Sequence, residues 1–305
     1  MRTIMLILAL SAIIFWGCSE EESPTQNPPA SGTLKLNING LEDLGSSAKY
    51  EGWIIVPTLS KSGGVVEDTP VSTGTFSVNS SGTLSQTDFE VDATNLANAT
   101  TFVLTIEPNP DSNPNPSAVH ILAGDFSGNI SNVTVGHPAA LGSDFTSATG
   151  TYILATPTNG SMTNENSGIW FLDLGTGNPA QGLFLPTLPA GWKYEGWTVI
   201  NGMPVTTGTF TTTTVVDDAD PYSSTMPGPP FPGEDFLINA PSGLSFPTDI
   251  AGGTAVISIE PDPDNSPNPF TLKPLVGDIP MNATDHFNYD MSTNLSSFPT
   301  GIVTR

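Results

Sequence analysis

Apolar and polar residues alternate in short runs along this chain of 305 residues. In residues 34–38 a leucine or isoleucine occupies every second position, and residues 101–107 repeat the pattern. Alternation with a period of two is typical of a β-strand that buries one face. Further strands are predicted at 50–56, 73–78, 119–126, 130–135, 151–156, 168–174 and 254–260. The strand at 50–56 is expected to end at Pro57, which has no backbone N–H to donate.

The sequence carries no helical pattern of apolar residues at i, i+3, i+4 and i+7. Glycine, proline and asparagine instead separate the predicted strands. Short strands between such turns favour antiparallel sheets packed face to face. The predicted fold class is therefore all-β, with immunoglobulin-like β-sandwich architecture.

One block of motifs occurs twice. It consists of Tyr-Glu-Gly-Trp, Pro-Val-x-Thr-Gly-Thr-Phe, Ile-Glu-Pro and Gly-Asp, and its copies lie at 50–125 and 194–278. A repeat spacing of roughly 150 residues is the size of a domain rather than of a solenoid unit. We therefore expect two tandem sandwich domains, at residues 32–147 and 148–305.

The two copies differ in the lengths between motifs. The first copy is longer between its first and second motifs, and the second copy is longer between its second and third. Length changes of this kind are tolerated in surface loops, because loop-closure entropy grows slowly with length. The insertion at 216–233, with three aspartates and five prolines, is accordingly predicted to be a surface loop.

The N-terminus has the pattern of a secretory signal peptide at residues 1–17. Arg2 precedes an apolar run at 4–16 that is shorter than the roughly twenty residues of a membrane-spanning helix. Residues 15–18 resemble a bacterial lipobox, which implies that Cys18 is lipidated; the alternative is a plain signal peptide with an incidental cysteine. Residues 18–31, polar and rich in proline, are expected to form a disordered tether.

These features predict a protein that is lipid-anchored outside the inner membrane, at the outer membrane. Three glutamates at 20–22 resemble an acidic signal that exports some lipoproteins to the cell surface, although a solvated spacer has the same composition. The sequence does not distinguish a periplasmic position from a surface-facing one.

The charge of the chain is strongly negative, with 30 acidic and 7 basic residues and a net charge of −23. Such a field repels nucleic acid and anionic lipid headgroups. We therefore expect no nucleic-acid partner, and we expect contact with the membrane only through the N-terminal lipid.

An acidic turn follows each Ile-Glu-Pro motif and is the main candidate for binding chemistry. Glu107 and Asp111 of the first copy correspond to Glu260 and Asp264 of the second, where Asp262 is added. Closely spaced carboxylates can bind Ca²⁺, and Asp262 and Asp264 are a weak candidate for such a site; no metal is otherwise expected. The alternative is that the aspartates hydrogen-bond the backbone of their own proline-rich turns.

The tryptophans divide into two groups. Trp53 and Trp197 share the alternation of apolar neighbours and are predicted to be core residues. Trp192 precedes the second Tyr-Glu-Gly-Trp motif in a predicted turn, so it is expected to be exposed and is a candidate for binding sugar rings. Glu51 and Glu195 are expected to face solvent or a partner.

No sequence motif of a known catalytic site is present, so the chain is predicted not to be an enzyme and to need no cofactor. The three histidines are scattered and have no counterparts between the copies. The repeated Asp125 and Asp278 are expected to pair with a backbone donor, and a pair of glycosidase carboxylates is the weaker alternative.

Together, the motifs resemble the extracytoplasmic C-terminal domain of anti-sigma-K factors of the RskA type. The leucine- and proline-rich segment 185–191, followed by Tyr194 and Trp197, matches that pattern closely, and the first copy matches it more loosely. The resemblance implies the fold and a role in sensing or binding at the cell envelope. The sigma-binding helical domain and the transmembrane helix of that family have no counterpart in this sequence, so no direct sigma-factor contact is expected. The alternative function is a surface adhesin that binds carbohydrate or calcium.

Overall fold

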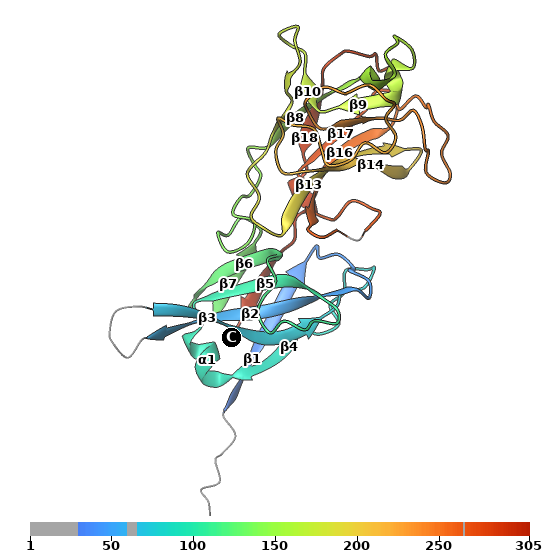
Figure 1. The fold of residues 1–305 in the computed structure, drawn as a ribbon. Coiled ribbons are helices and arrows are strands. Elements are labelled where there is room, and N and C mark those ends of the chain that lie inside the picture. The colour runs from blue at the N-terminus through green and yellow to red at the C-terminus, as the bar shows by residue number, and fades with distance from the viewer. Residues whose placement is uncertain (1–29, 60–65, 265) are drawn as a thin grey trace, which may run out of the picture.

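The structure, a computed structural model, describes residues 30–59, 66–264 and 266–305 and confirms the all-β prediction. Two large antiparallel sheets account for most of the regular structure (Figure 1). The signal peptide, Cys18 and most of the predicted tether lie outside the described residues. Within the described ranges, no helix has the length and apolar character needed to cross a membrane.

The first sheet has eight strands in the order β3-β2-β5-β6-β7-β19-β1-β4. A short helix, α1 (Ala93–Asn98), follows β4 and begins where Asp92 accepts a hydrogen bond from the Asn95 N–H. The strands are β1 (Ser31–Asn39), β2 (Ala48–Leu59), β3 (Val66–Phe76), β4 (Asp88–Asp92), β5 (Thr101–Pro108), β6 (His120–Ser127), β7 (Ile130–Thr134) and β19 (Thr300–Thr304).

The second sheet follows the path β14-β13-β16-β17-β18-β8-β9-β15, and β12 pairs with β8 beside this path. A separate two-stranded sheet joins β10 and β11. The strands are β8 (Thr149–Leu154), β9 (Gly168–Trp170), β10 (Leu172–Asp173), β11 (Ala180–Gln181), β12 (Leu183–Phe184), β13 (Trp192–Ile200), β14 (Met203–Phe210), β15 (Gly233–Asp235), β16 (Thr254–Pro261), β17 (Leu275–Asp278) and β18 (Tyr289–Thr293).

The last strand of the chain belongs to the first domain and not to the second. β19 lies between β7 and β1 and pairs antiparallel with both, with Val303 opposite Val133 on one side and Leu36 on the other. The expected range of the second domain, 148–305, is therefore wrong at its C-terminal end. The reason is long-range pairing, which places Val303 in the core of the first domain with no exposed surface.

The two sheets have the same strand order if β19 is taken as the counterpart of β8. On one side, β19 pairs with β7 and β8 pairs with β18, and both of these partners follow a Gly-Asp motif in the chain. On the other side, β19 is next to β1 and β8 is next to β9, and both of these neighbours precede a Tyr-Glu-Gly-Trp motif. Strands β8 and β19 also both begin with Thr-Gly, at 149–150 and 300–301. In the second domain this strand comes first in the chain, whereas the first domain receives it after the whole second domain.

The repeated motifs make the same core contacts in both domains. Tyr50 stacks on Phe76 with ring centroids 5.5 Å apart, and Tyr194 stacks on Phe210 at 5.7 Å. Both stacks lie in the main hydrophobic core. The Gly52 between Glu51 and Trp53 is required by space, because an added Cβ would lie 2.5 Å from the Thr73 hydroxyl oxygen. The motifs are thus the frame of each sandwich.

Strand β2 does not end at Pro57 as expected. It continues to Leu59, and Pro57 lies opposite Asp68 of β3. The other neighbour, β5, pairs with β2 only as far as Ile55. From there on, β2 has a single partner strand, so a residue without an N–H is tolerated on its open side.

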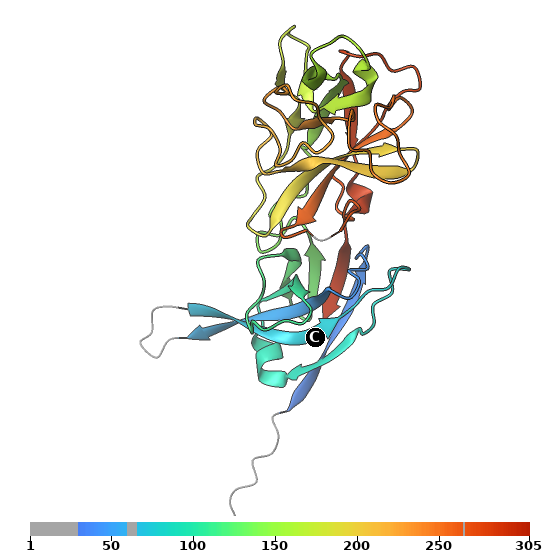
Figure 2. The same ribbon diagram turned by 45° about the vertical axis from the view of Figure 1, so that its right-hand side comes forward.

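The domains touch directly where two linking segments, 135–148 and 294–299, pass between them. The Glu42 carboxylate of the first domain accepts a hydrogen bond from the Thr271 N–H of the second at 2.6 Å. Gly191 lies so close to Ala118 that an added Cβ would be 2.7 Å from the carbonyl carbon of Ala118. The molecule is elongated, and β1 starts at the end of the first domain far from the second domain (Figures 1 and 2).

Candidate functional site at the paired glutamates

Each domain buries a pair of glutamates on two adjacent strands. Glu51 of β2 and Glu107 of β5 are 9% and 2% exposed, and Glu195 of β13 and Glu260 of β16 are 5% and 0% exposed. The expectation that Glu51 and Glu195 face solvent is therefore wrong. Each stands two residues before the tryptophan of its motif, so it shares the face of that tryptophan. This face is covered in both domains.

A relay of hydrogen bonds fixes the second glutamate of each pair. The Trp53 indole N–H donates to the Thr105 hydroxyl at 2.9 Å, and this hydroxyl donates to Glu107 Oε1. The Ser117 N–H donates to the same oxygen at 2.9 Å. The predicted core position of Trp53 is confirmed, since it is 3% exposed. Its indole also orients a carboxylate.

The second domain repeats this relay with different residues. The Trp197 indole N–H donates to the Ser258 hydroxyl at 2.8 Å, and Ser258 donates to Glu260 Oε1. The Phe270 N–H, at 2.9 Å, is a second donor to that oxygen. Trp197 is 2% exposed, which confirms its predicted core position. The relay is thus a property of the duplicated frame.

The first glutamate of each pair is held by a hydroxyl from the neighbouring strand. Ser72 donates to Glu51 Oε1, and Thr206 donates to Glu195 Oε1. In every one of the four glutamates it is Oε1 that receives the hydrogen bonds.

The two domains differ in the remaining carboxylate oxygens. In the second domain, oxygens of Glu195, Glu260 and Asp264 all lie within 4.8 Å of one another. The Oε2 atoms of Glu195 and Glu260 are buried and have no hydrogen-bond partner among the described residues. In the described part of the first domain, no corresponding carboxylate group is found, and no fully buried glutamate oxygen is without a hydrogen-bond partner.

Burial is the main cause that raises the pKa of both glutamates of the second domain, to about 7 for Glu195 and to about 8 for Glu260, and the nearby Asp264 carboxylate contributes to both shifts. Hydrogen bonds from Thr206 and Ser258 act in the opposite direction. Burial also raises the pKa of Glu51, although this side chain is less enclosed.

The acidic turns have the backbone hydrogen bonds that the turn interpretation requires. Asp111 Oδ1 accepts the Asn113 N–H at 2.8 Å, and Asp264 Oδ1 accepts the Ser266 N–H at 2.8 Å. Asp262 is exposed and does not belong to the carboxylate group of Asp264. The candidate pair Asp262 and Asp264 is thus replaced by a group in which Asp264 joins two buried glutamates.

Trp192 is not an exposed platform, and this expectation is wrong. It is 3% exposed, begins β13, and packs against Phe270 with ring centroids 6.1 Å apart. The residues before it do form a turn, but the strand starts at Trp192 itself and takes the ring inward. Its indole N–H has no hydrogen-bond partner.

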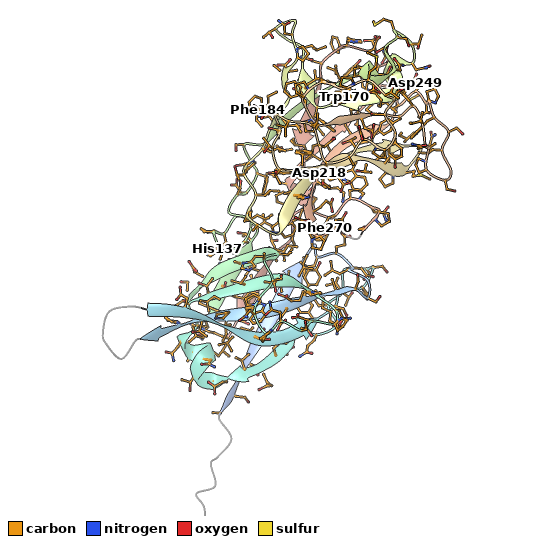
Figure 3. The ribbon with its side chains drawn as sticks, viewed as in Figure 1. His137, Trp170, Phe184, Asp218, Asp249 and Phe270 are labelled. Atoms are coloured by element: carbon orange, nitrogen blue, oxygen red, sulfur yellow. The ribbon has the colours of Figure 1, made fainter. Side chains whose placement is uncertain are left out.

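Two hollows border the carboxylate group. One, of about 310 Å³, lies at the domain junction between Glu42 and Ala48 of the first domain and Asp264 and Phe270 of the second. Figure 3 labels Phe270 at this junction. The other hollow, of about 380 Å³, is lined by residues that include Glu195 and by three loops of the second domain. The group is therefore reachable from the surface through Asp264, which is partly exposed.

The insertion at 216–233 is a largely exposed loop up to β15, as predicted, but Ser223 and residues 231–233 are buried. Its start folds back onto its end, where Asp217 accepts the Gly233 N–H at 2.9 Å. Beyond it, the fully buried Asp235 accepts the Trp170 indole N–H at 2.8 Å. Burial raises the pKa of Asp217 to about 8. The repeat did not predict that Asp217 and Asp235 would be buried. For Asp235, the signal in the sequence was a pair of acidic residues directly before the apolar run 236–238.

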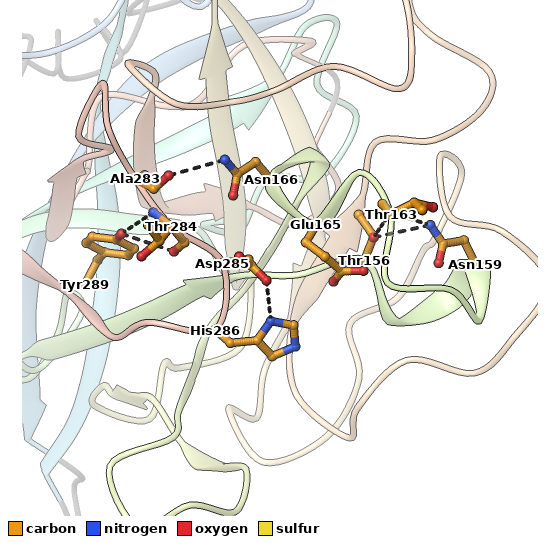
Figure 4. Close-up of polar contacts among 10 residues, drawn as sticks. All are labelled: Thr156, Asn159, Thr163, Glu165, Asn166, Ala283, Thr284, Asp285, His286 and Tyr289. Atoms are coloured by element: carbon orange, nitrogen blue, oxygen red, sulfur yellow. Dashed lines mark hydrogen bonds and ion pairs between the residues drawn. The ribbon is translucent and has the colours of Figure 1, made fainter.

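A second group of possible ligands lies in the loops of the second domain, where Glu165, Asp285 and His286 meet (Figure 4). His286 Nδ1 is 3.0 Å from Asp285 Oδ2, and Glu165 Oε2 accepts the Thr156 N–H at 3.1 Å. Both His286 and Asp285 retain more than two fifths of their side-chain surface. This group is thus more open than the paired glutamates.

Asp125 and Asp278 lie on β6 and β17 and so belong to different domains. Asp125 accepts a hydrogen bond from the Thr101 hydroxyl at 2.7 Å and lies 3.3 Å from His137 Nε2 (Figure 3). The Thr101 hydroxyl and His137 lower the pKa of Asp125. The partners of Asp125 are thus side chains, and not the backbone donor that was expected.

Comparison with protein-family models, with curated proteins and with solved structures finds no match for this chain.

Proposed function

We propose that this protein is a non-enzymatic, lipid-anchored protein of the cell envelope whose domains bind or sense an envelope component or a protein partner. The lipid anchor is proposed from Cys18 and the sequence around it. The two domains are proposed to be of the anti-sigma-K type, on the basis of their motifs. No sigma-factor contact is part of this proposal.

The observation that carries the proposal is the order of the parts in space. A tether ahead of β1 would attach to the far end of the first domain, so the second domain would be held away from the membrane (Figures 1 and 2). The second domain also carries the long insertion and both groups of clustered carboxylates. Binding features are thus concentrated in the domain that an anchored molecule presents outward.

The anchor is tested by replacing Cys18 with alanine in a bacterial host that processes lipoproteins. The native protein should incorporate radiolabelled palmitate and fractionate with the outer membrane. The Cys18→Ala variant should lose the label and leave the membrane fraction. Retention of the label in the variant would contradict the anchor.

The binding role is tested by crosslinking in intact cells of the native host. A matched pair of strains would express the native chain and a variant with residues 218–230 replaced by a short glycine-serine linker. A partner of the second domain should be captured by the native chain and lost or reduced with the variant. Capture of the same set of proteins by both strains would contradict a role for the insertion.

A surface adhesin is the second candidate, and the carboxylate group of the second domain favours its calcium form. A glycan array probed with the native chain, with and without Ca²⁺, separates the two candidates. Specific and calcium-dependent sugar binding would support the adhesin. Because Trp192 is buried, its ring is not available to a sugar.

A further inference from the structure

We infer that Glu195, Glu260 and Asp264 bind one calcium ion in the second domain, and that the corresponding residues of the first domain do not. This inference does not depend on the proposed envelope partner. It assigns a metal site to three side chains from two strands and the loop that follows β16.

The arrangement of the buried oxygens is the first argument. Glu195 and Glu260 each have one oxygen held by hydrogen-bond donors and one, Oε2, left without a partner. A buried polar atom without a partner is costly and rare in folded proteins. Donors fixed on one oxygen of a carboxylate are also how proteins orient metal ligands. The unpartnered oxygens are therefore the ones available to a cation.

The chemistry of the ligands selects the ion. All three side chains offer oxygen only, which suits hard cations and not zinc or copper. Two oxygens bound to one Ca²⁺ can be up to about 5 Å apart, because each lies roughly 2.3–2.6 Å from the ion. The group meets that limit, because one carboxylate oxygen from each of the three side chains lies within 4.8 Å of the other two. Mg²⁺ demands a shorter and more regular shell, so we assign calcium.

The local charge is the second argument. Three carboxylates meet here, and one ammonium, that of Lys273, donates its hydrogen bond to the Phe270 carbonyl at 2.6 Å. Lys273 interacts electrostatically with Glu42 across the domain junction and with Glu260, so this single positive charge is shared and does not balance the three carboxylates. Neutralising the group without a metal would require protons shared between the glutamates. A divalent cation neutralises it at pH values where those protons are lost.

The first domain provides a natural control within the same molecule. Glu51 and Glu107 have the same hydrogen-bonded oxygens as their counterparts, yet Asp111 is exposed and does not join them among the described residues. A site formed merely by the repeated frame would appear in both domains. The proposed site requires three converging carboxylates, an arrangement that the described residues form in the second domain and not in the first.

The position of the site predicts a structural role for the ion. Asp264 lies in the loop between β16 and β17, and the same loop carries Thr271, whose N–H reaches Glu42 of the first domain. An ion bound to Glu195, Glu260 and Asp264 would link this loop to strands β13 and β16 of the second sheet. Calcium binding should therefore stiffen the contact between the domains.

The test uses full-length protein purified in detergent and stripped of metal with EDTA. Calorimetric titration with CaCl₂ should give one ion per chain, and thermal melting should move upward by several degrees when Ca²⁺ is added. The variants Glu260→Gln and Asp264→Asn should each weaken binding more than about tenfold. The matched variant Glu107→Gln in the first domain should retain native binding. Asp264 is partly exposed, so Asp264→Asn remains informative if Glu260→Gln fails to fold.

Four results would overturn the inference. The first is no heat and no shift in melting temperature at millimolar Ca²⁺, which would mean that the glutamates share protons instead. The second is binding that survives both Glu260→Gln and Asp264→Asn. The third is tighter binding of Mg²⁺ than of Ca²⁺. The fourth is a stoichiometry of two ions per chain that Glu107→Gln reduces to one.

Discussion

At the scale of single residues, the duplicated motifs form hydrogen bonds to buried carboxylates as well as contributing to the packing of each core. Trp53 and Trp197 were predictable as core residues because they alternate with apolar neighbours. The burial of Glu51 and Glu195 was not predictable, because it depends on which loops cover the outer face of each sheet. Ala139 and Ala140, from the segment that links the domains, cover that face beside Trp53.

Glu260 should make the stability of the metal-free protein fall as pH rises. Its pKa is raised from 4.5 to about 8 in the folded chain, so folding favours the protonated form, and this preference becomes a cost above pH 4.5. The groups that face it are Glu195, Asp264 and Lys273. Between pH 5 and 8.5 in EDTA, we expect the native protein to lose on the order of a few kcal/mol relative to Glu260→Gln. Urea unfolding at several pH values measures this, and parallel curves would refute it.

The contribution of the indole hydrogen bond to stability should be measurable by comparing the same substitution at two tryptophans. Trp197→Phe removes the hydrogen bond to Ser258, whereas Trp192→Phe removes an indole N–H that has no partner. Both changes delete a similar volume from the core. We therefore expect Trp197→Phe to cost about 1 kcal/mol more in the free energy of unfolding, as determined by urea denaturation. Equal costs would show that the relay contributes nothing.

At the scale of elements, local pattern identified most strands, and pairing between distant segments escaped it. Residues 34–38, 101–107, 130–135 and 254–260 were predicted as strands and correspond to β1, β5, β7 and β16, although β7 ends one residue earlier, at Thr134. Strand β19 was missed because residues 300–304 are short and because its partners lie at the other end of the sequence. The continuation of β2 through Pro57 was missed for a similar reason, since it depends on where β5 stops pairing.

Strand β19 should be indispensable for the first domain. A chain that ends at Pro299 leaves β1 and β7 without their shared neighbour and exposes the core around Val133. We expect amide hydrogen exchange in β1 and β7 to approach that of an unfolded chain, while β13 and β16 remain protected. The control is Arg305→Ala, which removes the side-chain bonds to the Leu96 and Ala99 carbonyls but keeps the strand. Unchanged protection in the shortened chain would contradict this.

At the scale of the whole molecule, the domain junction joins the candidate site to the first domain. Glu42 is the residue on which this connection depends, because its carboxylate accepts the Thr271 N–H. The repeat predicted two domains, but it contained no information about their contact. Glu42 belongs to a segment that has only a loose counterpart before the second Tyr-Glu-Gly-Trp motif.

Substitution of Glu42 should loosen the junction without unfolding either domain. In Glu42→Ala, the Thr271 amide loses its acceptor, and we expect its hydrogen exchange to become at least about tenfold faster. Exposed Asp43 offers a neighbouring control, and Asp43→Ala should leave Thr271 unchanged. Small-angle scattering should show a broader distribution of interdomain distances for Glu42→Ala alone. Identical exchange in the two variants would exclude this role for Glu42.

The position of β19 also determines the order in which the protein can be completed during synthesis. Ribosomes make the first domain first, yet its sheet has a gap between β7 and β1 until the residues after β18 have been translated. The second domain, whose strands are contiguous in the chain, can close while the first is still open. The N-terminal domain is therefore the last to be finished, and premature termination anywhere in the second domain leaves it incomplete.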